Sequence, residues 1–208
     1  MVQTATYQPS ATATSPAAHG ADIADPGPLG LCGFALTTFV LSAINAGWYD
    51  AATTPIIVGL ALFYGGLAQL TAGMWEFKKA NTFGATAFTS YAAFWISLAA
   101  FLVLQGHIFI IPKAQVASAL GLFLLGWTIF TGIMLLASFR TNGALVVTFV
   151  LLFVTFLFLT IGELGPSTTW HQIGGWTGVA TAIAAWYTAL AGVLRSTFKQ
   201  QVLPVFPL

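Results

Sequence analysis

The chain has 208 residues, of which 5% are charged and 58% are hydrophobic, and its net charge is +1. Soluble domains carry about 25% charged residues, so this composition excludes a soluble globular protein. The near-neutral charge excludes a basic face for nucleic acid, and the single cysteine excludes a disulfide framework or a cysteine-rich metal site.

The first 28 residues differ from the rest of the chain. They are rich in Ala, Thr, Ser and Pro and contain no Lys or Arg. Because they hold too little apolar surface to form a core, residues 1–28 are predicted to be a disordered tail. They also lack the basic start and apolar stretch of a signal peptide, which predicts that the first helix is retained as an anchor.

Six long stretches without a charged residue follow, the longest between Lys79 and Lys113. A helix needs about 20 apolar residues to cross a hydrocarbon core roughly 30 Å thick, because it rises about 1.5 Å per residue. We therefore predict an all-α membrane protein with six transmembrane helices. Their predicted ranges are 29–48, 53–75, 83–105, 115–138, 143–163 and 172–194, which leaves 195–208 as a C-terminal tail.

Basic residues in the short loops predict the orientation. With six helices, both termini share one side of the membrane with the loops after the second and fourth helices. That side holds five basic residues, whereas the other side holds Lys113. The five are Lys78, Lys79, Arg140, Arg195 and Lys199. The positive-inside rule then predicts that both termini are cytoplasmic.

The first three predicted helices carry many polar side chains. Each costs free energy in hydrocarbon unless it is paired or hydrated. Hydrogen bonding between helices explains any one of them, whereas their concentration on three helices indicates a shared polar lining. The candidate lining residues are Thr37, Thr38, Asn45, Tyr64, Gln69, Thr86, Thr89, Ser90 and Tyr91.

Small residues have two interpretations. Gly174, Gly178 and Ala182 recur every four residues and favour close helix packing, within a subunit or between subunits. Gly65 and Gly66 could serve the same purpose or thin a helix where a solute passes. The sequence leaves both interpretations open.

Catalytic and metal-binding patterns are missing from the sequence. No two histidines or acids have metal-ligand spacing, and no serine lies in a G-x-S-x-G motif, so we predict no enzyme, cofactor or metal. No Lys or Arg lies in the middle of a predicted helix. Glu163 is the one acid expected within a helix end, where it is an interfacial residue or, alternatively, part of a proton relay.

Three predicted helices begin with a capping signal. Asp25 and Pro26 precede the first helix, and Asn81 and Asn142 precede the third and fifth. Such side chains accept hydrogen bonds from the free N–H groups of a first turn. The amides after Asp25 could also form an anion site if this segment dips into the membrane, and a surface cap explains the same residues equally well.

Several stretches resemble one known family. Residues 25–34 read DPGPLGLCGF and resemble the N-P-x-P-L-G-L-x-x-F signature of the acetate uptake transporter family, which includes bacterial succinate–acetate permeases and fungal acetate transporters. Residues 63–69 (FYGGLAQ) and 76–91 (EFKKANTFGATAFTSY) resemble two further motifs, and residues 202–204 resemble the usual tail. Asp25 replaces the family's Asn: it can still cap a helix, but its charge would repel an anion.

This resemblance implies an assembly and a path. Family members are six-helix subunits that form homohexamers, and each subunit has a constriction of one Phe, one Tyr and one Leu. Carried over by motif, the Phe is Phe34 and the Tyr is Tyr91, and the Leu falls at Leu152 by alignment of the fifth helix. Leu31 and Asn81, which lie inside the motifs, join the substrate-binding candidates.

The resemblance also implies a function. The family moves acetate and other short carboxylates, in some members succinate, and proton coupling is usually invoked. A carboxylate is heavily penalised in an apolar neck unless it is protonated, so we predict that the substrate crosses as the neutral acid or with a proton. We expect a multi-pass protein of the plasma membrane, whose partners are the substrate, the bilayer and further copies of the chain. The alternatives are a passive channel for small anions or neutral solutes, and a membrane nutrient sensor or scaffold.

Overall fold

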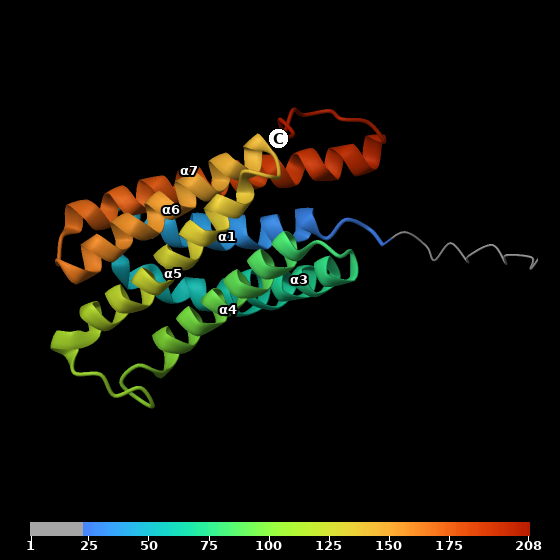
Figure 1. The fold of residues 1–208 in the computed structure, drawn as a ribbon. Helices are drawn as coiled ribbons and strands as arrows, with labels where there is room; N and C mark the ends of the chain where they lie inside the picture. Colours follow the sequence, from blue (N-terminus) through green and yellow to red (C-terminus); the bar gives the residue numbers. More distant parts are fainter. Residues whose placement is uncertain (1–22) are drawn as a thin grey trace, which may run out of the picture.

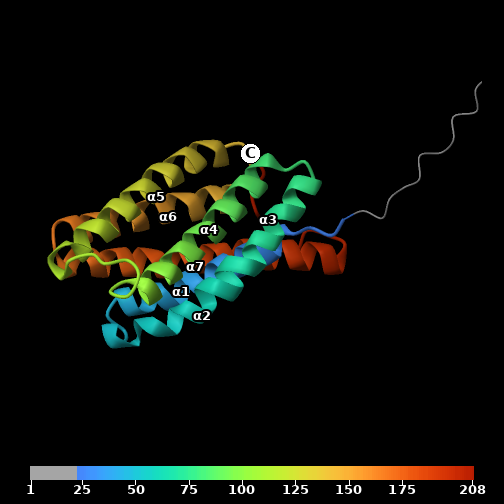
Figure 2. The same ribbon diagram turned by 90° about the horizontal axis from the view of Figure 1, so that it is seen from below.

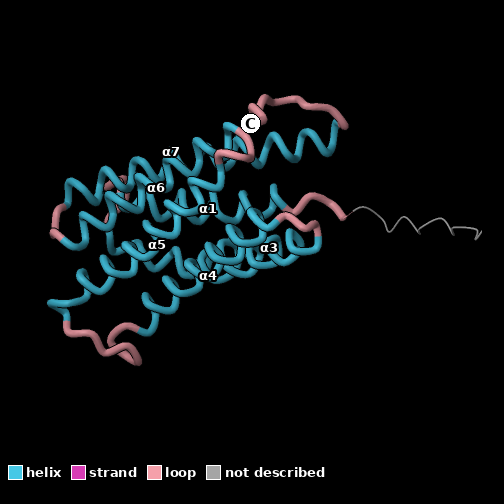
Figure 3. The backbone as a smooth tube through the Cα atoms, in the orientation of Figure 1, coloured by secondary structure: helices cyan, strands magenta, loops and turns pink. Residues whose placement is uncertain are grey.

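Residues 23–208 are described by the computed structural model, and six helical segments in them are long and apolar enough to cross a membrane. Figures 1 and 3 show these segments running roughly alongside one another. Five are single helices: α1 (Gly27–Asn45), α4 (Thr82–Leu104), α5 (Val116–Ser138), α6 (Gly143–Leu164) and α7 (Thr168–Phe198). The prediction of an all-helical fold with six spans is confirmed for this part of the chain.

The ends of these helices lie close to the predicted ones, with two shifts that concern the tails. The predicted tail 1–28 lies mostly outside the described residues, and Gly27 and Pro28 already belong to α1. At the other end, α7 continues through Arg195 to Phe198, so the helix passes the predicted boundary at 194 by four residues.

The second span is a composite of several helical segments. A 3₁₀ turn, η1 (Ala51–Ile56), leads into α2 (Ile57–Leu62), a π-helical segment η2 (Phe63–Ala68) and α3 (Gln69–Lys78). A Cβ on Gly65 in η2 would lie 2.7 Å from Thr37 Oγ1 and 2.8 Å from Trp95 Cδ1. Gly65 therefore allows α1 and α4 to approach η2 closely, which favours the packing interpretation of this glycine.

Helix caps fix the starts of α4 and α6. The Asn81 side chain accepts a hydrogen bond from Gly84 N at 3.1 Å, and the Asn142 side chain accepts one from Leu145 N at 3.0 Å. Both confirm the predicted caps. Asp25 lies one residue farther from its helix, where Oδ1 accepts a 3.2 Å hydrogen bond from Gly27 N.

Helix α1 is the central element, and α7 lies along it (Figures 1 and 2). A Cβ on Gly174 of α7 would lie 2.7 Å from Leu159 Cδ2 on α6, and one on Gly178 would overlap Ser42 on α1. The small residues of α7 therefore serve helix packing within the subunit. This close contact brings α1, α6 and α7 together along one side of the cavities described below.

The last ten residues fold back over the start of α6. The carbonyl oxygens of Phe206 and Val205 accept hydrogen bonds from Gly143 N and Ala144 N, at 2.7 and 3.2 Å. The Tyr187 hydroxyl donates to Pro204 O at 2.7 Å. The C-terminal segment thereby satisfies free N–H groups of the first turn of α6. It lies at the end of the bundle where α1 starts, which we call the basic end because Lys78, Lys79, Arg140, Arg195 and Lys199 lie there.

Candidate functional site

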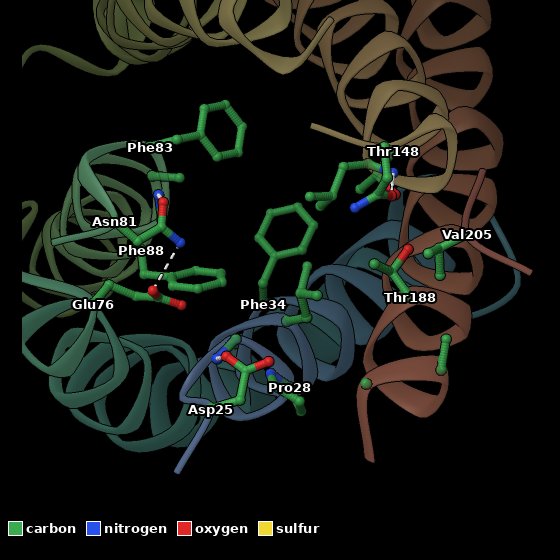
Figure 4. Close-up of a pocket in the computed structure, with 18 of the residues that line it drawn as sticks. Asp25, Pro28, Phe34, Glu76, Asn81, Phe83, Phe88, Thr148, Thr188 and Val205 are labelled. Atoms are coloured by element: carbon green, nitrogen blue, oxygen red, sulfur yellow. Dashed lines mark hydrogen bonds between the residues drawn. The ribbon is translucent and has the colours of Figure 1, made fainter. Parts of the chain in front are cut away.

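A cavity of about 230 Å³ reaches into the bundle from the basic end. Residues of α1, α3, α4, α6 and α7 line it, and Figure 4 shows Phe34 and Phe88 projecting between these helices. Side-chain amides and hydroxyls are spread along its wall, among them those of Gln69, Asn81, Asn142, Thr148, Thr188 and Gln201. The cavity therefore combines hydrogen-bonding groups with aromatic surface, a combination suited to a small solute with one polar and one apolar end.

The charged side chains that line this cavity are Asp25, Glu76 and Arg195, and one of them forms a salt bridge. Lys79 Nζ lies 3.0 Å from Asp25 Oδ1 in a salt bridge. Beside it, Asn81 Nδ2 donates to Glu76 Oε2 at 2.8 Å, shown as a dashed line in Figure 4. Glu76 is only 2% exposed. The expectation that Glu163 is the one acid within a helix end is therefore wrong, because α3 continues past residue 75 and buries Glu76.

The floor of the cavity is mainly apolar and tightly packed. Phe34, Tyr91 and Leu152 line it from α1, α4 and α6, and each is at most 5% exposed. The Phe34 and Tyr91 ring centroids are 5.8 Å apart. The Tyr91 hydroxyl is 3.0 Å from Thr131 Oγ1 on α5, a hydrogen bond that fixes the position of the ring. We call Phe34, Tyr91 and Leu152 the neck.

A second cavity, of about 610 Å³, lies at the opposite end of the bundle. Its inner wall includes Phe94 and Phe156, whose ring centroids are 5.2 Å apart at an interplanar angle of 86°. Asn45 lines this cavity, as do Glu163 and His171, and His171 Nδ1 lies 3.4 Å from Glu163 Oε1. Among residues 23–208, none lines both cavities.

The barrier between the two cavities is thin. On α4, Tyr91 lines one cavity and Phe94 lines the other, a separation of about 4.5 Å along the helix axis. On α6, the step from Leu152 to Phe156 is about 6 Å. The two cavities thus approach each other from opposite ends, and the spacing on α4 and α6 leaves a short, mainly apolar barrier between them.

Comparison with known proteins agrees with this architecture. The profile of the GPR1/FUN34/yaaH family matches residues 4–208. The chain belongs to this family. The succinate-acetate/proton symporter SatP of Escherichia coli K12 is 40% identical over 190 residues, which cover 88% of this chain and 95% of the symporter.

Other members of the GPR1/FUN34/yaaH family extend the comparison. Acetate permease A of Emericella nidulans is 45% identical over 197 residues, or 88% of this chain. The match covers 65% of the fungal permease, so the chain spans about two thirds of the length of that relative. The solved structure of the bacterial acetate channel SatP superposes with a TM-score of 0.82 at 38% identity, covering 88% of this chain and 99% of the other. These relatives are named as a symporter, a permease and a channel, and none of the three as an enzyme.

The structure divides the candidate residues from the sequence into three groups. The first group lines the basic-end cavity and consists of Leu31, Phe34, Gln69, Asn81, Tyr91 and Leu152. The second group has one member, Asn45, which lines the opposite cavity. Neither lining includes the third group, which consists of Thr37, Thr38, Tyr64, Thr86, Thr89 and Ser90. Two of these bond to their own helix, because Thr37 and Thr89 donate to Gly33 O and Ala85 O.

Sequence reasoning missed several lining residues of the cavity. Thr148 and Thr188 lie on α6 and α7, outside the three helices for which a polar lining is predicted. The missed aromatic pair is Phe83 and Phe149, whose ring centroids are 5.3 Å apart near the mouth. The signal available was the presence of threonine in otherwise apolar spans. Among residues 23–208, no three His, Cys, Asp or Glu side chains gather in a way that could hold a metal ion.

Proposed function

We propose that this protein transports acetate and other short carboxylates, including succinate, across the plasma membrane. The observation that carries this proposal is the pair of cavities that approach each other from opposite ends, with a thin apolar barrier between them. The names of the related permease and symporter support acetate and succinate as the substrates. In this proposal, the substrate binds in one cavity, crosses the neck and leaves through the other cavity.

The chemistry of the neck favours a neutral or proton-accompanied substrate. Phe34 and Leu152 offer a carboxylate no hydrogen bond, and the Tyr91 hydroxyl is already paired with Thr131. A carboxylate that sheds its water among these side chains is strongly destabilised, and protonation removes most of that cost. We therefore propose proton coupling, in which the carboxyl group is protonated before it enters the neck and ionises again beyond it.

We further propose an assembly and an orientation for the transporter. Five basic residues lie at the end where α1 begins and Lys113 lies towards the other end, which supports cytoplasmic termini. The basic-end cavity is then the cytoplasmic one. Large apolar side chains such as Leu122, Leu136 and Ile129 of α5 are exposed on the single subunit, as expected for contact with lipid or with neighbouring subunits. This is compatible with a homohexamer in which each subunit contains its own path.

A passive channel is the second candidate function. The observation that favours it is the close structural match to a relative that is named as a channel, whereas the related symporter is named for proton coupling. A channel would conduct without saturating and would ignore an imposed pH gradient. A coupled carrier would show saturation and counterflow.

The deciding experiment measures uptake of labelled acetate into proteoliposomes that contain the purified protein. Protein-free liposomes give the passive permeation of acetic acid, which is subtracted. With an inward proton gradient and no acetate gradient, we expect protein-dependent accumulation of acetate above equilibrium, and its collapse when a protonophore is added. Uptake that ignores the gradient would refute proton coupling and leave the channel. Absence of any protein-dependent uptake would refute acetate transport itself.

A further inference from the structure

Gln69 is a buried side chain whose polar atoms have no partner. It is the first residue of α3, its exposure is 0%, and neither Nε2 nor Oε1 makes a hydrogen bond within the described part of the chain. Burying an amide without partners costs the full desolvation of its donor and acceptor groups, so native proteins seldom do so without a reason. Gln69 therefore marks a place where a polar group from outside the chain can bind.

Gln69 lies at the level of the neck. It lines the basic-end cavity together with Phe34 and Tyr91. A Cβ on Gly33, the residue before Phe34, would lie 3.6 Å from Gln69 Cβ. Helical side chains lean toward the N-terminus of their helix, which for α3 is the direction of η2 and of the opposite cavity. The amide therefore extends from the floor of the cavity alongside the apolar barrier.

Two further unpartnered polar atoms lie at about the same depth. Thr38 Oγ1 is one turn beyond Phe34 on α1, and Trp95 Nε1 is one turn beyond Tyr91 on α4. Trp95 packs against Gly65, four residues before Gln69. The barrier is thus apolar where Phe34, Tyr91 and Leu152 face the cavity, but unpaired hydrogen-bonding groups lie beside it.

The two unpaired atoms of Gln69 match one protonation state of a carboxylic acid. An undissociated carboxyl group has an O–H that donates and a C=O that accepts, so it can form two parallel hydrogen bonds with the Nε2–H and Oε1 of one amide. A carboxylate offers acceptors only, which would leave Oε1 unpaired against a negative charge. The pairing works for either orientation of the amide, because both ends of the amide are free.

We infer that Gln69 is a specificity-determining residue that binds the undissociated carboxyl group of the substrate at the neck and discriminates against its anion. This inference rests on the proposed function, since it names the form of the substrate that crosses. It also gives the unpaired amide a purpose: the acid supplies both missing hydrogen bonds during passage.

The test compares Gln69→Met with wild type and with Gln69→Asn in proteoliposomes. Methionine keeps an unbranched side chain of similar length and removes both hydrogen-bonding atoms. Leu67→Met is the matched control, because Leu67 lies on the same span but is 53% exposed on the outside of the bundle. Size-exclusion profiles and thermal melting of each variant show that it is folded, and protein-free liposomes give the background flux.

Two labelled solutes are used as probes, acetate at pH 6 and pH 8 and acetamide at both values. The undissociated share of a carboxylic acid with a pKa near 4.3 falls about 100-fold between these values, so wild-type acetate flux should fall by a similar factor. Acetamide donates and accepts like the undissociated acid but does not ionise, so its flux should not change with pH. In Gln69→Met, loss of two hydrogen bonds should lower acetate flux at pH 6 and acetamide flux on the order of tenfold. Gln69→Asn should retain part of both fluxes.

Each other outcome has a distinct meaning. Wild-type flux of both solutes in Gln69→Met would overturn the inference and leave Gln69 as the site of a buried water only. A wild-type acetate flux that follows total acetate, rather than the undissociated acid, would also overturn it while leaving acetate transport intact. If the wild type shows no protein-dependent acetate flux at all, the proposed function itself fails.

Discussion

The neck and the mouth of the basic-end cavity lie a few helical turns apart and differ in the charge and burial of their side chains. At the mouth, Asp25 and Lys79 form a salt bridge with side chains that are 53% and 33% exposed. At the neck, Phe34, Tyr91 and Leu152 are at most 5% exposed, and none carries a charge. The exposed side chains of the salt bridge at the mouth can exchange their partners for water, whereas packing on all sides fixes the side chains of the neck.

This difference indicates where control of passage lies. Exposed ion pairs contribute about 0–1 kcal/mol, because water screens them and ordering two long side chains costs entropy. Buried side chains pack at a density similar to that of organic crystals, so changing the volume of one side chain disturbs its neighbours in the same layer. We therefore expect substitutions at the neck to change transport strongly and substitutions at the mouth to change it weakly.

Closing the neck should produce the largest effect. Leu152→Trp places a bulky ring in the layer that Leu152 shares with Phe34 and Tyr91, and overpacking of this kind costs about 1–3 kcal/mol of stability. Protein-dependent acetate uptake into proteoliposomes should fall on the order of tenfold or more, because a rise of about 1.4 kcal/mol in the barrier already gives tenfold.

Val150→Trp is the control for this substitution. Val150 lies two residues away on α6 but is 40% exposed, so the same ring there should point away from the path. Its uptake should stay close to that of the wild type. Equal uptake by Leu152→Trp and wild type would show that the path does not cross this layer.

Removing the hydroxyl of Tyr91 should separate stability from transport. Tyr91→Phe keeps the ring in the neck but leaves Thr131, which is 0% exposed, without the tyrosine hydroxyl 3.0 Å away. An unsatisfied buried hydroxyl costs about 1–3 kcal/mol, so the melting temperature in detergent should fall by several degrees. Uptake should change by less than about threefold, because the ring that forms the neck remains.

Tyr187→Phe is the matched control, since its hydroxyl bonds to Pro204 O in an exposed setting. There water can replace the lost partner, so the melting temperature should change little. A large loss of uptake in Tyr91→Phe without a change in melting temperature would instead place the hydroxyl itself in the substrate path.

The membrane-spanning fold was predictable because the bilayer imposes a simple rule. A span must be long and free of charge, so the gaps between charged residues located six helices to within a few residues of those in the structure. The internal form of the second span was not predictable. Gly65 and Gly66 are compatible with an α-helix, so the sequence does not indicate the π-helical form, and only the contacts with Thr37 and Trp95 show how closely the segment packs.

The site was harder to predict than the fold. In helices that are apolar all round, the sequence does not say which face meets a cavity, so Gln69 and Thr89 looked alike as polar residues in a span. The structure separates them, because Gln69 lines the cavity unpaired while Thr89 bonds to Ala85 O in its own helix. A threonine can satisfy itself in this way, but a glutamine amide with two free ends cannot, so the polar residues of a span are not equivalent signals.

The mouth should yield the smallest effect. Asp25→Asn removes the salt bridge with Lys79 but keeps an oxygen that can accept from Gly27 N, as Asp25 Oδ1 does at 3.2 Å. The free energy of unfolding should change by less than about 1 kcal/mol, because the pair is exposed. The loss of one negative charge at the mouth should raise acetate flux from the basic-end side by less than about twofold at low salt, and the gain should disappear as salt screens the site. Flux measured over a series of salt concentrations tests this directly. A tenfold change in flux from this exposed position would show that charge at the mouth, rather than packing at the neck, limits the rate, and the contrast between the two regions would be reversed.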